Sequence, residues 1–284
     1  MPFFNFLRRR GLQPSWEYTT QGNIWRLHLS SRGRLVGEER DAERKCATFF
    51  CIDLSTGSPL WKDKTFGDPW WTGIEAVHRD VVFLHGYTTP DMPEHKGMTA
   101  VDLGTGEVLW KDDRVTFIAA SGEIVYASRT VPAGKLLAEI EFRTGAVVRE
   151  RGGADDVANA VPGGGQEPTD VVLPSRLQQG ASALAVLLRS ACGPAAASGP
   201  VEYIVDNGLA IFGYHERVES PSRERSSWRS LLAVVDRGSG GVQLKMVLDD
   251  AVAFPGTDAF LVRDAMLYFV RRRRTLTAVA LRDS

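Results

Sequence analysis

The chain has 284 residues, of which 43% are hydrophobic and 24% are charged, as in ordinary globular proteins. Its 34 Lys and Arg residues nearly balance its 35 Asp and Glu residues, so the formal net charge is -1. This balance argues against a protein that binds nucleic acid or anionic lipid through its overall charge.

The N-terminal segment and the cysteines bear on where the protein works. Residues 1–10 place aromatic residues before three arginines, the reverse of the order in a secretory signal. No apolar stretch has the length of a membrane span. The cysteines Cys46, Cys51 and Cys192 form no disulfide pattern. We therefore expect a cytoplasmic protein with no membrane and no nucleic-acid partner.

A repeated motif organises the chain. Its clearest copy is residues 100–110 (AVDLGTGEVLW), and residues 51–61 (CIDLSTGSPLW) change only the leading Ala of the pattern. Degenerate copies are residues 139–149 and 234–244, and a truncated copy ends the chain from residue 278. In each copy a strand leads into a glycine-containing turn and a second strand returns. The residues expected to be structural in these repeats are Trp16, Asp53, Gly57, Trp61, Asp102, Thr105, Gly106, Trp110, Gly145, Asp236 and Gly240.

Short apolar strands precede each copy, so one repeat supplies four strands, which is the content of a propeller blade. The acidic positions 53, 102, 141 and 236 are 49, 39 and 95 residues apart, and the last step spans about two repeats. We expect one all-β domain over residues 1–284, a single β-propeller of five or six four-stranded blades. The expected blades are residues 24–62, 70–111, 117–150, 201–248, and 251–284 together with 14–19.

Two parts of the chain complete this prediction. Residues 151–199 are either a degenerate sixth blade or an insertion with a helix around residues 174–192, where leucines recur on one stripe. The last repeat lacks its fourth strand and its tryptophan, whereas residues 14–19 form a strand that contains Trp16 and has no partner nearby. We expect this strand to join the last blade and close the ring, because closure removes exposed sheet edges.

The motif resembles the repeat of quinoprotein-type β-propellers, whose docking signature residues 100–110 match in full. In that superfamily the tryptophan wedges between blades while the acid and the Thr-Gly pair fix the turn, so the resemblance implies a fold and no activity. Residues 70–75 and 85–97 also resemble an uncharacterised bacterial family of unknown function. A quinone-dependent dehydrogenase is disfavoured, because the adjacent cysteine pair of such enzymes is missing, and we expect no cofactor.

Side chains suited to chemistry gather in the second predicted blade and, more faintly, around residues 202–216. Loops at residues 38–45, 88–96 and 216–228 are predicted to share one face, and rigid scaffolds often bind ligands through such loops. The candidate binding residues are Trp70, Trp71, Glu75, His85, Tyr87, Asp91, Glu94, His95, Glu202, Tyr214 and His215. We expect a non-enzymatic binding or scaffold module that engages a protein or small-molecule ligand there, without a metal. The alternative is a metal-assisted enzyme that uses Glu75, His85, Asp91, Glu94 and His95.

Overall fold

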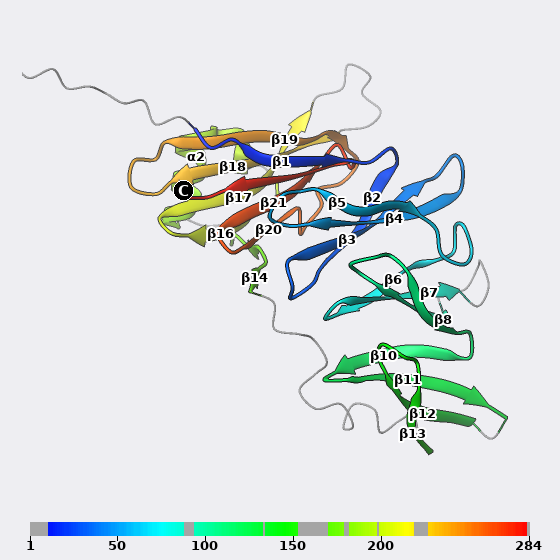
Figure 1. Cartoon of the computed structure of the whole chain (residues 1–284). Helices are drawn as coiled ribbons and strands as arrows, with labels where there is room; N and C mark the ends of the chain where they lie inside the picture. The colour runs from blue at the N-terminus through cyan, green and yellow to red at the C-terminus, as the bar shows by residue number, and fades with distance from the viewer. Residues whose placement is uncertain are drawn as a thin grey trace, which may run out of the picture. The chain divides into compact units, whose positions relative to one another are not determined.

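The computed structural model describes residues 11–87, 94–132, 134–152, 170–178, 182–197, 199–218 and 227–282. These residues form five antiparallel sheets, one α-helix and one 3-10 helix (Figure 1). The predicted all-β class is therefore confirmed. The chain divides into two compact units, one of residues 20–169 and one of residues 1–19 with residues 170–284.

The described part of residues 20–169 contains three four-stranded sheets, each built from consecutive antiparallel strands. The first contains β2 (Asn23–Leu29), β3 (Arg34–Asp41), β4 (Cys46–Asp53) and β5 (Pro59–Lys64); the second contains β6 (Gly73–His78), β7 (Val81–Tyr87), β8 (His95–Asp102) and β9 (Val108–Asp112); the third contains β10 (Val115–Ser121), β11 (Ile124–Val131), β12 (Gly134–Glu141) and β13 (Val147–Gly152). Buried apolar side chains of consecutive sheets form common clusters, so the core lies between the sheets. Each sheet therefore covers one face of the next.

The second unit contains two five-stranded sheets. One has the order β1 (Pro14–Thr19), β22 (Thr275–Ala280), β21 (Met266–Arg271), β20 (Phe260–Arg263) and β14 (Val171–Val172); the other has the order β15 (Ser175–Arg176), β16 (Glu202–Asp206), β17 (Leu209–Val218), β18 (Ser227–Asp236) and β19 (Val242–Val252). The N-terminal strand β1 pairs with β22 from Pro14 opposite Val279 to Thr19 opposite Thr275. The predicted union of residues 14–19 with the last strands is thus confirmed.

Residues 151–199 are predicted to form either a degenerate sixth blade or an insertion with a helix, and residues 153–169 lie outside the described part. Their described part supplies the short strands β14 and β15 and the helix α2 (Ala183–Cys192), followed by the 3-10 helix η3 (Pro194–Ala197). The Ser182 side chain caps α2 by accepting a hydrogen bond from the Ala185 backbone N–H. Leu188 is fully buried against β17 and β18. Within the described residues, this segment therefore extends two sheets and adds a helix, and it forms no sheet of its own.

The repeated motif forms the same turn in four places. Asp53 and Asp102 each accept two backbone N–H bonds from their turn, at 2.8–3.1 Å. Glu141 and Asp236 accept equivalent bonds in the degenerate copies. The turn glycines have φ values from +67° to +72°, which favour glycine. These glycines are Gly57, Gly106, Gly145 and Gly240.

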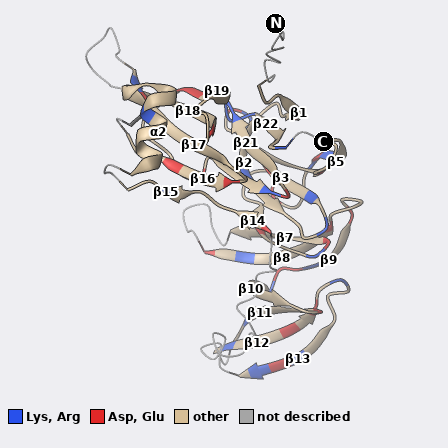
Figure 2. Cartoon of the chain, turned by 90° about the vertical axis from the view of Figure 1, so that its left-hand side faces the viewer, with Lys and Arg blue, Asp and Glu red and all other residues tan. Residues whose placement is uncertain are grey.

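Tryptophans link consecutive sheets of the first unit in one repeated way. The Trp61 indole N–H donates to the Leu103 carbonyl oxygen at 2.9 Å, and the Trp110 indole N–H donates to the Phe142 carbonyl oxygen at 2.9 Å. Each indole covers the turn glycine of the following sheet. Arg149 occupies the corresponding position of β13, a strand that is exposed along its whole length and carries interspersed basic and acidic residues (Figure 2). Such charges protect an edge strand from pairing with other chains.

Gly106→Ala is expected to lower the free energy of unfolding by about 2–4 kcal/mol. The left-handed φ contributes about 1 kcal/mol of strain, and displacement of Trp61 contributes about 1–3 kcal/mol, because the new Cβ would lie 2.8 Å from Trp61 Cδ2. Gly122 has φ +59° and open space around its Cβ position, so Gly122→Ala should cost only the strain. Urea denaturation of both variants measures the difference. Equal losses would contradict close packing of the indole on the turn.

Candidate functional site

Glu75, His85 and His95 come together from three adjacent strands, β6, β7 and β8. The β6–β7 register shifts between Ile74 and Ala76, so Glu75 is the extra residue of a bulge. The β7–β8 register shifts between Leu84 and Gly86, which places His85 at a second irregularity. Bulges turn side chains away from the regular alternation and are frequent beside functional sites. The two irregularities therefore explain why residues of three strands converge.

The cluster is tight. The His95 Nδ1 atom lies 2.6 Å from Glu75 Oε2, and the imidazoles of His85 and His95 stack with centroids 3.5 Å apart at an angle of 11°. The Tyr87 ring stands edge-on to both imidazoles, with centroids 5.0 and 5.3 Å away. One nitrogen or oxygen of each of the three titratable residues lies within 4.8 Å of the others. Among the described residues, this is the one group whose spacing suits a metal ion.

His85 is buried, with an exposed fraction of 2%. Its Nδ1 atom lies 3.2 Å from the Gly86 carbonyl oxygen, and because a carbonyl only accepts, Nδ1 carries the proton and Nε2 presents a lone pair. Burial lowers the pKa of His85 to about 4, so the ring is neutral at pH 7. The buried Nε2 has no hydrogen-bond partner among the described residues. A buried polar atom without a partner costs about 1–3 kcal/mol, so this nitrogen calls for a functional explanation.

A buried ion pair between Glu38 and Arg40 fixes the backbone at the start of β6. Glu38 is fully buried and accepts from Arg40 Nε at 2.5 Å and from the Ile74 backbone N–H at 3.0 Å. The Arg40 guanidinium also donates to the carbonyl oxygens of Trp70 at 2.7 Å and Thr72 at 3.1 Å. The prediction of a loop at residues 38–45 is wrong in part, because β3 continues to Asp41. Side chains alternate between the two faces of β3, so Glu38 and Arg40 lie on the same face. From there they hold the backbone that precedes Glu75 through hydrogen bonds.

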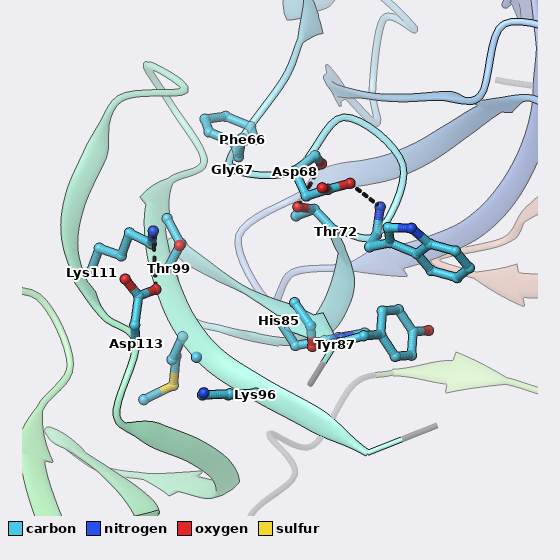
Figure 3. A pocket seen from close by; sticks show the side chains of 14 residues that line it. Phe66, Gly67, Asp68, Thr72, His85, Tyr87, Lys96, Thr99, Lys111 and Asp113 are labelled. Atoms are coloured by element: carbon cyan, nitrogen blue, oxygen red, sulfur yellow. Dashed lines mark hydrogen bonds and ion pairs between the residues drawn. The ribbon is translucent and has the colours of Figure 1, made fainter. Parts of the chain in front are cut away.

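A cavity of about 410 Å³ lies beside the cluster, on the side of His85 and Tyr87 (Figure 3). The indole of Trp71 stands edge-on to Tyr87, with centroids 5.8 Å apart, and together they form an aromatic wall. The Lys111 ammonium pairs with Asp113 at 3.0 Å, whereas the exposed Lys96 has no partner among the described residues. The lining residues are Phe66, Gly67, Asp68, Trp71, Thr72, His85, Gly86, Tyr87, Lys96, Gly97, Met98, Thr99, Lys111 and Asp113. The volume lies within the range of small-molecule sites.

The other candidate residues of this region lie around the cluster. Trp70 packs edge-on against Trp71, and the Arg40 guanidinium lies 5.0 Å from the Trp70 ring centroid. Glu94 is exposed and precedes β8, outside the cluster. Asp91 lies outside the described residues. The structure thus brings together three of the five residues of the metal-assisted alternative, and it adds Glu38 and Arg40, which were not predicted.

Glu202, Tyr214 and His215 lie in the second unit, where each is buried. The Glu202 carboxylate accepts from the Asp258 backbone N–H, at 2.9 and 3.0 Å to its two oxygens. Burial raises the pKa of Tyr214, whose hydroxyl lies beside the Cys192 thiol. The His215 Nδ1 atom lies 3.4 Å from the Pro200 carbonyl oxygen. Their use as binding residues stays a prediction.

Protonation of His215 is expected to make folding less favourable in mild acid. Burial lowers the pKa of His215 below its ordinary value of 6.5. The unfolded chain therefore takes up a proton as the pH falls through 6.5, while the folded chain does so only at lower pH. Stability is thus lost toward low pH, by at most about 1.4 kcal/mol per pH unit for one group. Urea denaturation between about pH 7.5 and about pH 5.5 should show a smaller loss for His215→Gln; parallel losses would contradict this assignment.

The fold and the cluster define an all-β protein of repeated sheets with a cavity and a histidine pair in its second sheet. Residues 30–110, which include β3 to β8, the first part of β9 and the whole cluster, match a family described as "Domain of unknown function (DUF4905)". Comparison with curated proteins found no match. Among the described residues, no helix has the length and apolar character that a membrane crossing requires.

Two similar solved structures have very different sequences. One, described as "Crystal structure of the eukaryotic initiation factor", has 9% identity and a TM-score of 0.34 over 79% of this chain. This chain spans 55% of the length of that one. The other, Kluyveromyces lactis Hsv2, has 8% identity and a TM-score of 0.29 over 93% of this chain and 76% of its own. At these scores the similarities carry no conclusion about function.

Proposed function

We propose that the chain is a β-propeller of quinoprotein-like repeats that acts as a binding module. The repeated turns and the two tryptophan wedges support this architecture, because each links one sheet to the next in the same way. The pairing of β1 with β22 supports ring closure, since β1 leads directly into β2. In such a protein the repeats supply a rigid frame, and a site is added to it locally.

The ligand site of this module is the cavity in the β6–β9 sheet, and the cavity is the observation that carries the proposal. Strands β7 and β8 supply His85, Tyr87 and Thr99, so this side of the cavity is held by the sheet. Trp71 and Tyr87 offer aromatic faces and edges to a planar ligand. The Lys96 ammonium, which has no partner among the described residues, offers a charge-assisted hydrogen bond to an anionic group. We therefore propose a small planar ligand with a carboxylate or similar group.

Filling the cavity is expected to abolish this binding. A library of aromatic and heteroaromatic carboxylic acids is screened by saturation-transfer NMR in the presence of EDTA. Thr99→Trp places an indole in the cavity, and Val108→Trp adds the same group at a half-exposed position of β9 that does not line it. Binders of the wild type should lose their signal with Thr99→Trp and keep it with Val108→Trp. A library in which no compound distinguishes these variants contradicts the proposed site.

A further inference from the structure

We propose that Glu75, His85 and His95 together bind one divalent transition-metal ion, with zinc as the best match. This inference rests on the binding function proposed above, since it names an inorganic ligand for the same site. It adds a cation to a site whose organic ligand occupies the neighbouring cavity.

The ligand types select the class of metal. Two imidazole nitrogens and one carboxylate oxygen suit zinc and neighbouring transition metals, whereas calcium and magnesium prefer oxygen ligands alone. Each ligand comes from a separate strand of one meander, ten residues from the next along the chain. Strands fix their side chains more firmly than loops do, so the ligands are held near one another before an ion arrives.

Binding of an ion requires the ligand atoms to move closer together and the imidazoles to turn. In a tetrahedral zinc site with bonds of about 2.0–2.2 Å, ligand atoms lie roughly 3.4 Å apart, and here they lie within 4.8 Å of one another. Glu75 Oε2 and His95 Nδ1, 2.6 Å apart, share a hydrogen that the ion would replace. The stacked imidazoles of His85 and His95 must tilt relative to each other, so that the nitrogen lone pair of each ring points at the same ion. The His95 side chain is 29% exposed and has room to turn, while buried His85 stays in place.

The unpartnered Nε2 atom of His85 points independently to a ligand. Nδ1 of the same ring is occupied by the Gly86 carbonyl, so the free lone pair is fixed on Nε2. A Cβ at Gly73 would lie 2.9 Å from this nitrogen, so a larger residue at that position would crowd the imidazole. A metal ion is one partner that satisfies a buried lone pair which no donor of the described residues reaches.

Three protein ligands leave at least one coordination position for water or another ligand, as in catalytic rather than purely structural zinc sites. His85 belongs to the cluster and also lines the cavity. A carboxylate of a molecule in the cavity is therefore the type of group that would complete the coordination. The metal and the proposed planar acid would then bind more tightly together than either does alone.

The test uses the full chain, purified without a histidine tag, stripped with EDTA and then freed of it. Zinc chloride is titrated calorimetrically, and cobalt chloride is titrated while the visible absorption is recorded. We expect one ion per chain and the intense d–d bands of a low-coordinate cobalt site. Glu75→Gln and His95→Gln should each weaken zinc binding by at least about 10–100-fold. The matched control is His78→Gln, because His78 is buried in the same sheet, and its Nε2 contacts the Gly122 carbonyl outside the cluster.

Zinc binding that is equally strong in the wild type and in His95→Gln overturns the proposal, as does an equal loss in His78→Gln. Both cluster variants change partly exposed side chains, so their folding is checked by near-UV circular dichroism and does not depend on replacing buried His85. The fragment screen is run in EDTA and the metal titration without fragments. Failure of the metal site therefore leaves the proposed cavity binding to be judged separately.

Discussion

Trp61→Ala is expected to lower the free energy of unfolding by about 3–5 kcal/mol, the usual cost of truncating a large core side chain. Trp61 is 7% exposed, packs edge-on against Phe66 at 6.3 Å, and donates its indole N–H to Leu103. Its removal leaves a cavity between two sheets and uncovers the turn at Gly106. Urea denaturation followed by far-UV circular dichroism measures the loss without depending on tryptophan fluorescence.

Trp25→Ala is the matched control for this variant. Trp25 lies in the same sheet and is 63% exposed, so its truncation should cost less than about 1 kcal/mol. Trp61→Phe separates packing from hydrogen bonding, because it keeps an aromatic ring and removes the donor to Leu103. Comparable losses for Trp25→Ala and Trp61→Ala would mean that the repeated tryptophan does not link the sheets.

Arg40→Met is expected to cost about 3–5 kcal/mol, because it leaves the carboxylate of Glu38 buried and unpaired. Glu38 is fully buried, and Arg40 is also the donor that holds the carbonyl oxygens of Trp70 and Thr72. Replacing the carboxylate as well, in Glu38→Gln with Arg40→Met, should recover a large part of the loss. Thermal and urea denaturation of the single and double variants measure this coupling.

Arg32→Met provides the exposed counterpart. The Arg32 guanidinium pairs with Asp80 at 2.5 Å, but its side chain is 63% exposed, so the change should cost about 0–1 kcal/mol. A loss for Arg40→Met no larger than that for Arg32→Met contradicts the structural role of the buried pair. The role matters for function because the same pair fixes the backbone that precedes Glu75.

The repeated parts of the fold were the most predictable from sequence. Asp102, Gly106 and Trp110 recur at fixed spacing because the acid accepts hydrogen bonds from the turn, the glycine adopts a left-handed φ, and the tryptophan covers the next turn. The pairing of residues 14–19 with the last strand followed from an incomplete repeat at each end. The leucine stripe favours a helix around residues 174–192 as one of two alternatives for that segment, and the helix observed begins only at Ala183.

The sequence predicts which residues belong to the candidate site, but it does not predict how they are arranged in space. Glu75, His85 and His95 match no metal motif, because short motifs describe ligands on one helix or turn. Here the ligands come from three strands, and two register shifts set their positions. No pattern of residues in the sequence indicates these shifts. The charged residues of segment 38–45 favour a loop in the sequence, whereas Glu38 and Arg40 lie on β3 and share one of its faces.

The most direct test of the site is anomalous diffraction from crystals of the full chain soaked in cobalt chloride, measured on both sides of the cobalt absorption edge. The structure predicts a single strong anomalous peak within bonding distance of Glu75, His85 and His95, with the His85 Nε2 atom as one ligand. Crystals with no peak at these residues, or with peaks only at surface carboxylates, would contradict a metal-binding site in the β6–β9 sheet.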